Sequence, residues 1–144
     1  MQCPKCGVAL TGSQNQMACQ TCGGMFVTEA LLDEMLRTVD GSIDPTERRT
    51  LADWPDGDAG PRLCPHCQAP MLQLVIERIP VERCKTHGVW FDGQELERVL
   101  SPHVTAESFT AREEIRRFFA DHLEFGSLTA LIEAIRRLIR RTRD

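Results

Sequence analysis

Cysteine placement is the feature that most constrains how this chain of 144 residues can fold. Six of its seven cysteines lie in three Cys-x-x-Cys pairs, and the seventh begins a Cys-x-x-His pair. The four short turns therefore supply eight side chains that can bind a metal, and they use every cysteine in the chain. These residues are Cys3, Cys6, Cys19, Cys22, Cys64, Cys67, Cys84 and His87.

Two such turns together provide the four thiolate or imidazole ligands of a tetrahedral metal ion. The first set has the spacing C-x2-C-x12-C-x2-C, and the second has C-x2-C-x16-C-x2-H. This pattern predicts one Zn2+ in each set, and so two per chain. Four protein ligands are typical of a closed structural site, because a catalytic zinc keeps one position for water. We expect zinc to supply much of the folding free energy, so that the metal-free chain is partly unfolded.

Other interpretations of the cysteines account less well for the pattern. The odd number of cysteines and the expected reducing compartment disfavour a disulfide framework. A rubredoxin-like iron site shares the paired turns, but His87 fits zinc better. A redox Cys-x-x-Cys motif would stand alone at the start of a helix, and buried apolar cysteines would not fall in pairs. We expect His66, His103 and His122 to be solvated side chains and not ligands.

The chain contains an internal repeat of about 35 residues, with its two copies separated by roughly sixty positions. Each copy predicts a β-hairpin between its ligand pairs, at residues 8–17 and 71–81. A short helix is expected after each second pair, around residues 31–36 and 95–100. Thr28 is the expected N-cap of the first helix, and Asp92 with Glu95 marks the start of the second.

This repeat predicts a small metal-stabilised α+β protein. Two zinc ribbons, each with β-hairpin knuckles and a short helix, are followed by a C-terminal α-helical hairpin. The expected domains are the first ribbon at 1–39, a linker at 40–62, the second ribbon at 63–101 and the helical segment at 102–144. The linker is dense in turn residues, so we expect little regular structure there beyond a turn around 46–54. We also expect the two ribbons to have separate small cores.

The C-terminal segment shows helical periodicity. Residues 106–125 predict one helix that ends at Gly126, and a second helix begins at Ser127. Its apolar stripe consists of Leu128, Leu131, Ile132, Ile135, Leu138 and Ile139. We expect this stripe to pack on the preceding helix, on a second copy in a homo-oligomer, or on a protein partner. Contact with an anionic membrane is disfavoured because the stripe has no Trp or Phe.

Composition and charge limit the class of protein. No apolar run approaches the roughly 18 residues of a membrane span, and the start of the chain has no secretory signal, so we expect a cytoplasmic protein. Residues 1–100 carry 9 basic and 14 acidic side chains, which disfavours binding to a phosphate backbone. We find no nucleophile with a base, no phosphate-binding Gly loop and no acid pair, so we expect no enzymatic activity and no catalytic residue.

The motif of the second copy runs from Cys64-Pro65-His66-Cys67 to the Cys84-to-Asp92 stretch, with Glu-Leu-Glu-x-Val-Leu after it. It resembles the TFIIB-type zinc-finger family of small, mostly bacterial proteins. The resemblance implies zinc ligation by Cys64, Cys67, Cys84 and His87, with Trp90 and Asp92 at the usual aromatic and acidic positions. The first copy keeps its ligands but has Met25 to Thr28 where the family has a Val-Trp-Leu-Asp type of run.

These observations favour a non-enzymatic zinc-binding adaptor or regulatory protein that acts through protein–protein contacts. The alternative is a nucleic-acid-binding, transcription-related zinc-ribbon protein. In that case Arg136, Arg137, Arg140 and Arg141 of the basic C-terminal helix would contact phosphates.

Overall fold

The computed structural model describes residues 1–39, 50–76 and 78–100. Its elements are β1 (Thr11–Gly12), β2 (Gln16–Ala18), β3 (Met25–Thr28), α1 (Glu29–Val39), η3 (Leu51–Asp53), β4 (Asp58–Leu63), β5 (Pro70–Ile76), β6 (Ile79–Cys84), β7 (Gly88–Phe91) and α2 (Glu95–Leu100). The predicted C-terminal hairpin at 102–144, its oligomer contact and residues 40–49 of the predicted linker lie outside the described residues. No helix in the described ranges is both long and apolar enough to cross a lipid bilayer.

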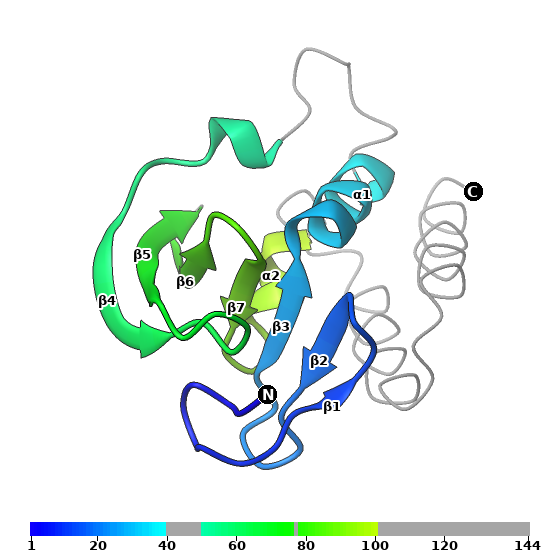
Figure 1. The fold of residues 1–144 in the computed structure, drawn as a ribbon. Coiled ribbons are helices and arrows are strands. Elements are labelled where there is room, and N and C mark those ends of the chain that lie inside the picture. Colours follow the sequence, from blue (N-terminus) through cyan, green and yellow to red (C-terminus); the bar gives the residue numbers. More distant parts are fainter. Residues whose placement is uncertain (40–49, 77, 101–144) are drawn as a thin grey trace, which may run out of the picture.

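All seven strands form one antiparallel sheet with the order β1-β2-β3-β7-β6-β5-β4. The central pair, β3 and β7, joins the two repeats strand to strand, with Phe26 opposite Trp90 and Val27 opposite Val89. Figure 1 shows β3 and β7 side by side in the middle of the molecule. The expectation of two separate cores is therefore wrong. In each repeat the last strand would be an edge with unpaired backbone groups, and pairing the two edges satisfies them.

The predicted hairpins are both present but differ in length. The second is long, with β5 and β6 paired from Leu72–Arg83 to Ile76–Ile79. The first is short, because β1 has 2 residues and β2 has 3. In the predicted linker, η3 falls within the expected turn, but β4 was not expected. This strand contains Pro61 and a register shift between Ala59 and Leu63, both suited to the sheet edge that it forms.

One face of the sheet is covered by the two helices. Alternation along the central strands directs Met25 and Val27 of β3, and Val89 and Phe91 of β7, into the same core as both helices. Members of this core from the helices are Leu31, Leu32, Met35, Leu36, Leu96, Val99 and Leu100. Side chains from both repeats thus share one hydrophobic core, and neither repeat buries its apolar face alone.

The two helix starts match their predictions differently. Before α2 the backbone N–H of Asp92 donates to Glu95 Oε2 at 2.8 Å, so the predicted contact between these two residues is present, although Glu95 is the first residue of α2 and not the third. The prediction that Thr28 caps α1 is wrong. Thr28 is the last residue of β3, and its buried hydroxyl has no hydrogen-bond partner among the described residues. Thr28 directly precedes α1, but its hydroxyl makes no capping hydrogen bond to the helix.

Candidate metal centres

The structure brings all eight predicted ligands together in two groups of four. In each group the ligand atoms lie within 4.8 Å of one another. In the first group the Cys3 and Cys22 Sγ atoms are 3.7 Å apart, and those of Cys6 and Cys19 are 4.0 Å apart. A tetrahedral zinc with Zn–S bonds of about 2.3 Å places its sulfurs about 3.8 Å apart. The first group therefore has the dimensions of a zinc site with four thiolates.

The second group has the dimensions of a site with three thiolates and one imidazole. The Cys67 and Cys84 Sγ atoms are 3.8 Å apart, and His87 Nδ1 lies 3.4 Å from Cys84 Sγ and 3.9 Å from Cys64 Sγ. Because Nδ1 is the ring nitrogen nearest to the sulfurs, Nδ1 is the ligand atom of His87. The geometry thus assigns a ligand atom that the spacing alone did not give.

Tight turns aim the sulfurs of each pair at one point. In the first turn the backbone N–H groups of Lys5 and Cys6 donate to Cys3 Sγ at 3.4 and 3.3 Å. The residue that follows the second cysteine then has a positive φ, which is 74° at Gly7, 70° at Gly23 and 60° at Gln68. Glycine reaches this region at little steric cost, whereas Gln68 reaches it while donating from Nε2 to the Cys64 carbonyl at 3.2 Å.

Without a metal the crowded thiols are unequal in acidity. The side-chain hydrogen bond with Cys22 raises the pKa of Cys6 to about 12. Burial opposes ionisation of Cys19, but the backbone N–H groups of Cys22 and Thr21 lower its pKa to about 7. Burial raises the pKa of Cys64 to about 11. A divalent cation allows all the thiols to ionise together, because it neutralises the charge that they would otherwise concentrate in one place.

His66 contacts the second site without being one of its four ligands. Its side chain is exposed, as the sequence predicted, but its ring stacks on His87 with centroids 4.6 Å apart and planes 3° from parallel. The stacked ring covers one side of the His87 imidazole. His103 and His122 lie outside the described residues.

A network of charged residues around Asp92 connects the two repeats, and sequence reasoning did not find it. Both carboxylate oxygens of Asp92 accept from Arg62, at 3.2 Å each, and Oδ1 also accepts from Trp90 Nε1 at 3.1 Å. Lys5 of the first repeat lies 3.3 Å from Asp92 Oδ2, and Arg62 reaches Glu82 Oε2 at 3.1 Å. The Trp90 and Arg62 hydrogen bonds outweigh burial and lower the pKa of Asp92. The sequence did show Trp90 and Asp92 two residues apart, but it gave no sign that Lys5 and Arg62 are the partners of Asp92.

A second connection between the repeats starts at Arg83, beside the ligand Cys84. Arg83 Nε donates to Glu29 Oε1 at 2.6 Å, at the start of α1, and its Nη1 donates to the Leu51 carbonyl at 3.1 Å. The guanidinium therefore joins β6, α1 and η3.

Comparison with known proteins agrees with this geometry. The family model described as Transcription factor zinc-finger matches residues 63–102. These residues form a TFIIB-type zinc ribbon. The match contains Cys64, Cys67, Cys84 and His87, and the Cys3-to-Cys22 group repeats the arrangement, so the chain has two tandem zinc ribbons with ligands for two zinc ions. No curated protein and no solved structure matches the chain.

Proposed function

We propose that this protein is a non-enzymatic adaptor, and that its first ribbon docks a protein partner. The observation that carries this proposal is the near absence of charge in residues 1–28, where Lys5 is the one charged side chain. That charge is paired with Asp92 of the second ribbon. Protein interfaces are depleted of charged residues at their centre, whereas surfaces that bind phosphate are basic. The first ribbon, with few charged residues, therefore resembles the centre of a protein interface and not a phosphate-binding surface.

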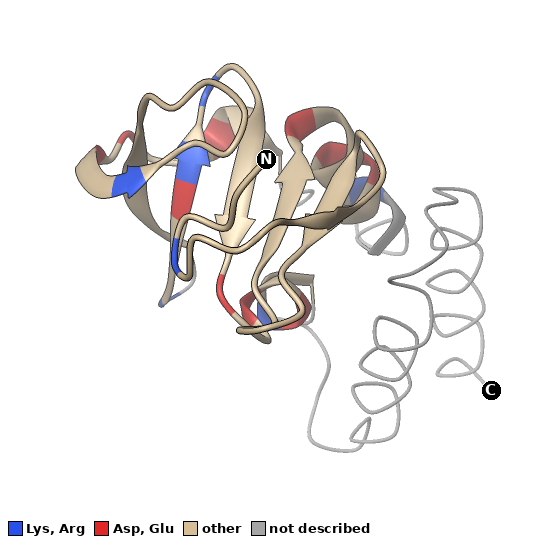
Figure 2. Ribbon diagram, turned by 60° about the horizontal axis from the view of Figure 1, so that its bottom comes forward, with Lys and Arg blue, Asp and Glu red and all other residues tan. Residues whose placement is uncertain are grey.

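The exposed side chains of the first ribbon suit such a contact. Met1 is 48% exposed and Val8 is 39% exposed, and uncharged polar residues such as Thr11 and Gln20 lie on the same ribbon. Figure 2 shows blue and red segments mainly on the second ribbon and on the helices, whereas the strands β1 and β2 are tan. Apolar and uncharged polar groups are removed from water at a lower cost than charges, so this surface favours a protein partner.

The charges of the described residues also disfavour a nucleic-acid contact. They include seven Lys or Arg side chains, of which five are paired with carboxylates in the same structure. These five are Lys5, Arg37, Arg62, Arg83 and Lys85. A basic side chain that already has a carboxylate partner must lose it before it can bind a phosphate.

Two further features support a non-enzymatic role. Each candidate site offers four protein ligands, which would leave no position on a bound zinc for a water nucleophile. A groove of about 700 Å3 lies between α1, η3 and β6, and its charged lining includes Glu29, Asp33, Arg37 and Arg83. These four pair with one another, Arg83 with Glu29 and Arg37 with Asp33, and such pairing suits a structural role.

The test is to add charge to each ribbon in turn in the full-length, zinc-loaded protein. One variant carries Thr11→Glu and Gln20→Glu on the first ribbon, and a matched control carries Gln73→Glu and Thr86→Glu on the second, all at exposed positions. Proteins that co-purify from the native cell are quantified by mass spectrometry. We expect the first variant to lose a partner that the control retains. Equal retention by the two variants, or no co-purifying protein with the wild type, would contradict the proposal.

The alternative is a transcription-related protein that binds nucleic acid, which the description of the matching family favours. Fluorescence anisotropy with single-stranded DNA, duplex DNA and RNA across a salt series separates the two functions. The adaptor proposal predicts no binding at low salt. Salt-dependent binding that is lost when Arg136, Arg137, Arg140 and Arg141 are together replaced by Ala would favour the alternative.

A further inference from the structure

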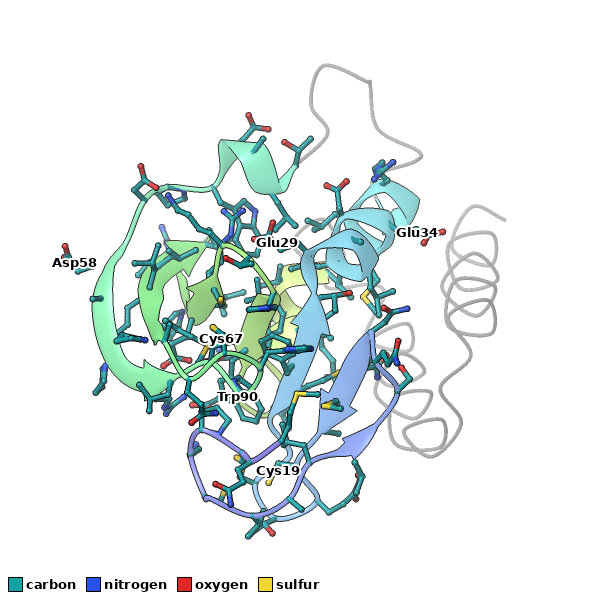
Figure 3. The ribbon with its side chains drawn as sticks, viewed as in Figure 1. Cys19, Glu29, Glu34, Asp58, Cys67 and Trp90 are labelled. Atoms are coloured by element: carbon teal, nitrogen blue, oxygen red, sulfur yellow. The ribbon has the colours of Figure 1, made fainter. Side chains whose placement is uncertain are left out.

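The two zinc sites lie on the same face of the sheet, opposite the helices, and share one cluster of buried side chains. Cys3 and Cys19 of the first site and Cys64 and Cys84 of the second belong to this cluster, and Phe26 and Trp90 also belong to it. Trp90 has no exposed surface. In Figure 3 Trp90 is drawn between Cys19 of the first ribbon and Cys67 of the second. A side chain of the second ribbon is thus part of the surroundings of the first site.

The contact of Trp90 with the first site is a close one. A Cβ atom on Gly24 would lie 2.2 Å from Trp90 Cζ2, so the indole ring rests directly on the Gly24 backbone. The Gly24 carbonyl in turn accepts a hydrogen bond from the Cys19 N–H at 2.8 Å, which closes the turn that holds Cys19 and Cys22. The ring therefore packs against the peptide that fixes two ligands of the first zinc.

Asp92 reaches the other turn of the first site. Its carboxylate holds the Lys5 ammonium at 3.3 Å, and Lys5 lies between the ligands Cys3 and Cys6. The Trp90 N–H donates to the same carboxylate, so the position of Asp92 and that of the indole ring depend on each other. Both turns of the first site are consequently held by residues that follow the last ligand of the second site.

The first ribbon supports the second site in a corresponding way. Gly88 follows the ligand His87, and a Cβ atom on Gly88 would lie 2.2 Å from the Val27 carbonyl oxygen of β3. Arg83 precedes the ligand Cys84 and is bonded to Glu29 of the first ribbon. The residues on either side of the Cys84-to-His87 turn thus contact the first ribbon, Arg83 through its side chain and Gly88 through its backbone.

From these contacts we infer that the two sites bind zinc cooperatively, and that Trp90 and Asp92 of the second ribbon are positioning residues for the first site. Zinc in the second site orders the Cys84-to-His87 turn and the strand β7 that follows it. Ordered β7 places the indole ring and the carboxylate against both turns of the first site, so the first zinc binds a preformed set of thiolates. By linkage, the first zinc strengthens binding of the second by the same factor.

Native mass spectrometry of the full-length protein tests this cooperativity directly. Zinc is held by a chelator buffer at a level that fills half of the sites. Two independent sites, whether equal or unequal in affinity, would give about half or more of the chains with a single zinc, and a smaller fraction requires cooperativity. We expect chains with no zinc and with two zinc ions to dominate. A wild-type population in which about half or more of the chains carry one zinc would overturn the inference.

Variants that keep all eight ligands test the two positioning residues. Trp90→Phe and Asp92→Asn are compared with the matched controls Trp54→Phe and Asp58→Asn, which lie outside the metal-facing cluster. Co2+ replaces zinc as the probe, because a site with four thiolates and a site with an imidazole differ in visible absorption. We expect the first two variants to weaken Co2+ binding at the four-thiolate site by about fivefold or more, a typical coupling between sites. The controls leave it unchanged.

A merely structural role within the second ribbon gives a different result. In that case Trp90→Phe and Asp92→Asn would weaken Co2+ at the site that contains His87 and leave the four-thiolate site unchanged, which would overturn the inference. Reciprocity provides a further check. Cys19→Ser removes a ligand from the first site and Cys67→Ser removes one from the second, and the two changes should weaken the remaining site by equal factors. Unequal factors, or no weakening in either variant, would also overturn it.

Discussion

The two ribbons have the same metal-binding plan but differ in how much structure surrounds it. The first has a hairpin of 2 and 3 residues, four thiolate ligands and one charged residue before its helix. The second has a hairpin of 7 and 6 residues, an imidazole ligand and the additional strand β4. Its Arg62 pairs with both Glu82 and Asp92. The second ribbon therefore forms many contacts within itself, whereas the first depends on the pairing of its strand β3 with β7 of the second.

A repeated motif therefore does not imply two equal domains. The first ribbon has few contacts within its own short hairpin. Strand pairing with β7 and side-chain contacts with Trp90 and Asp92 stabilise it instead. In return it contributes α1, whose side chains fill the core under both ribbons. The pairing of β3 with β7 makes these mutual contacts possible, because it aligns the two copies and leaves the metal sites together on one face of the sheet.

Removal of zinc should have the largest effect on stability. It should also affect the two ribbons to different extents. Structural zinc contributes an apparent binding free energy of about 10–16 kcal/mol in small zinc domains, so full removal should abolish cooperative unfolding. With limiting chelator we expect amide hydrogens of β1 and β2 to exchange before those of β5 and β6, because the first hairpin has fewer pairs of its own. Hydrogen exchange followed by NMR measures this order. Earlier exchange in β5 and β6 would contradict the unequal dependence of the ribbons.

Substitution of Gly88 should have the next largest effect on stability, because Gly88 lies where β7 pairs with β3. In Gly88→Ala the new methyl group would lie 2.2 Å from the Val27 carbonyl oxygen, at a φ of 154°. We expect a loss of about 1–3 kcal/mol in the free energy of unfolding, the usual cost of overpacking. Gly7→Ala is the matched control. Gly7 also has a positive φ, but nothing lies within 4 Å of its added methyl, so its cost should be about 1 kcal/mol. Urea unfolding of the zinc-loaded variants measures both losses in the free energy of unfolding. Equal losses would argue against close packing between β3 and β7.

Neutralising Asp92 should cost about 1–2 kcal/mol, through weaker charged hydrogen bonds in a partly buried network. The pKa of Asp92 is lowered, so its contribution is fully present above the pKa of the unfolded chain and is lost only as pH falls through the lower folded value. The thiolates take up protons and release zinc at higher pH than this. Asp92→Asn should therefore lower the melting temperature by the same amount from about pH 6 to 8. A shift that varies across this range, measured by calorimetry, would contradict the assignment.

The smallest effect is expected at the residue after the second ligand of a turn. Gly7 and Gln68 occupy equivalent positions, both with positive φ. Gln68→Gly should stabilise the second ribbon by less than about 1 kcal/mol, and Gly7→Gln should destabilise the first by about 1 kcal/mol. The pair of variants, compared by thermal unfolding, measures whether the two turns are energetically alike. Destabilisation by Gln68→Gly would mean that the Gln68 hydrogen bond to Cys64 outweighs its backbone strain.

Local features of the fold could be predicted from the sequence. Paired cysteines allow few partners, so all eight ligands were correctly grouped, and the stretches between the ligand pairs predicted both hairpins. The second helix and the contact between Asp92 and Glu95 followed from capping chemistry within four residues of chain. Each of these predictions depends on groups close together in the chain or on the number of ligands that a metal requires.

Contacts between the repeats could not be predicted, since nothing local specifies them. Strands β3 and β7 are each four residues of apolar character, a pattern that a buried helix segment can also have. Their pairing joins residues sixty or more positions apart, and the sequence does not state which edges meet. The partners of Asp92 are similarly remote, since Arg62 lies 30 residues and Lys5 more than eighty residues before it in the chain. Strand β4 was missed because its Gly, Pro and Asp are typical of loops.

The two ribbons form one sheet through β3 and β7. The most direct measurement is an NMR search for cross-strand nuclear Overhauser effects in the full-length, zinc-loaded protein. The account predicts contacts between Met25 and Phe91, Phe26 and Trp90, and Val27 and Val89, in the antiparallel register. Complete hairpin contacts within each ribbon, with no contact between residues 25–28 and 88–91, would contradict it and leave two ribbons that fold apart.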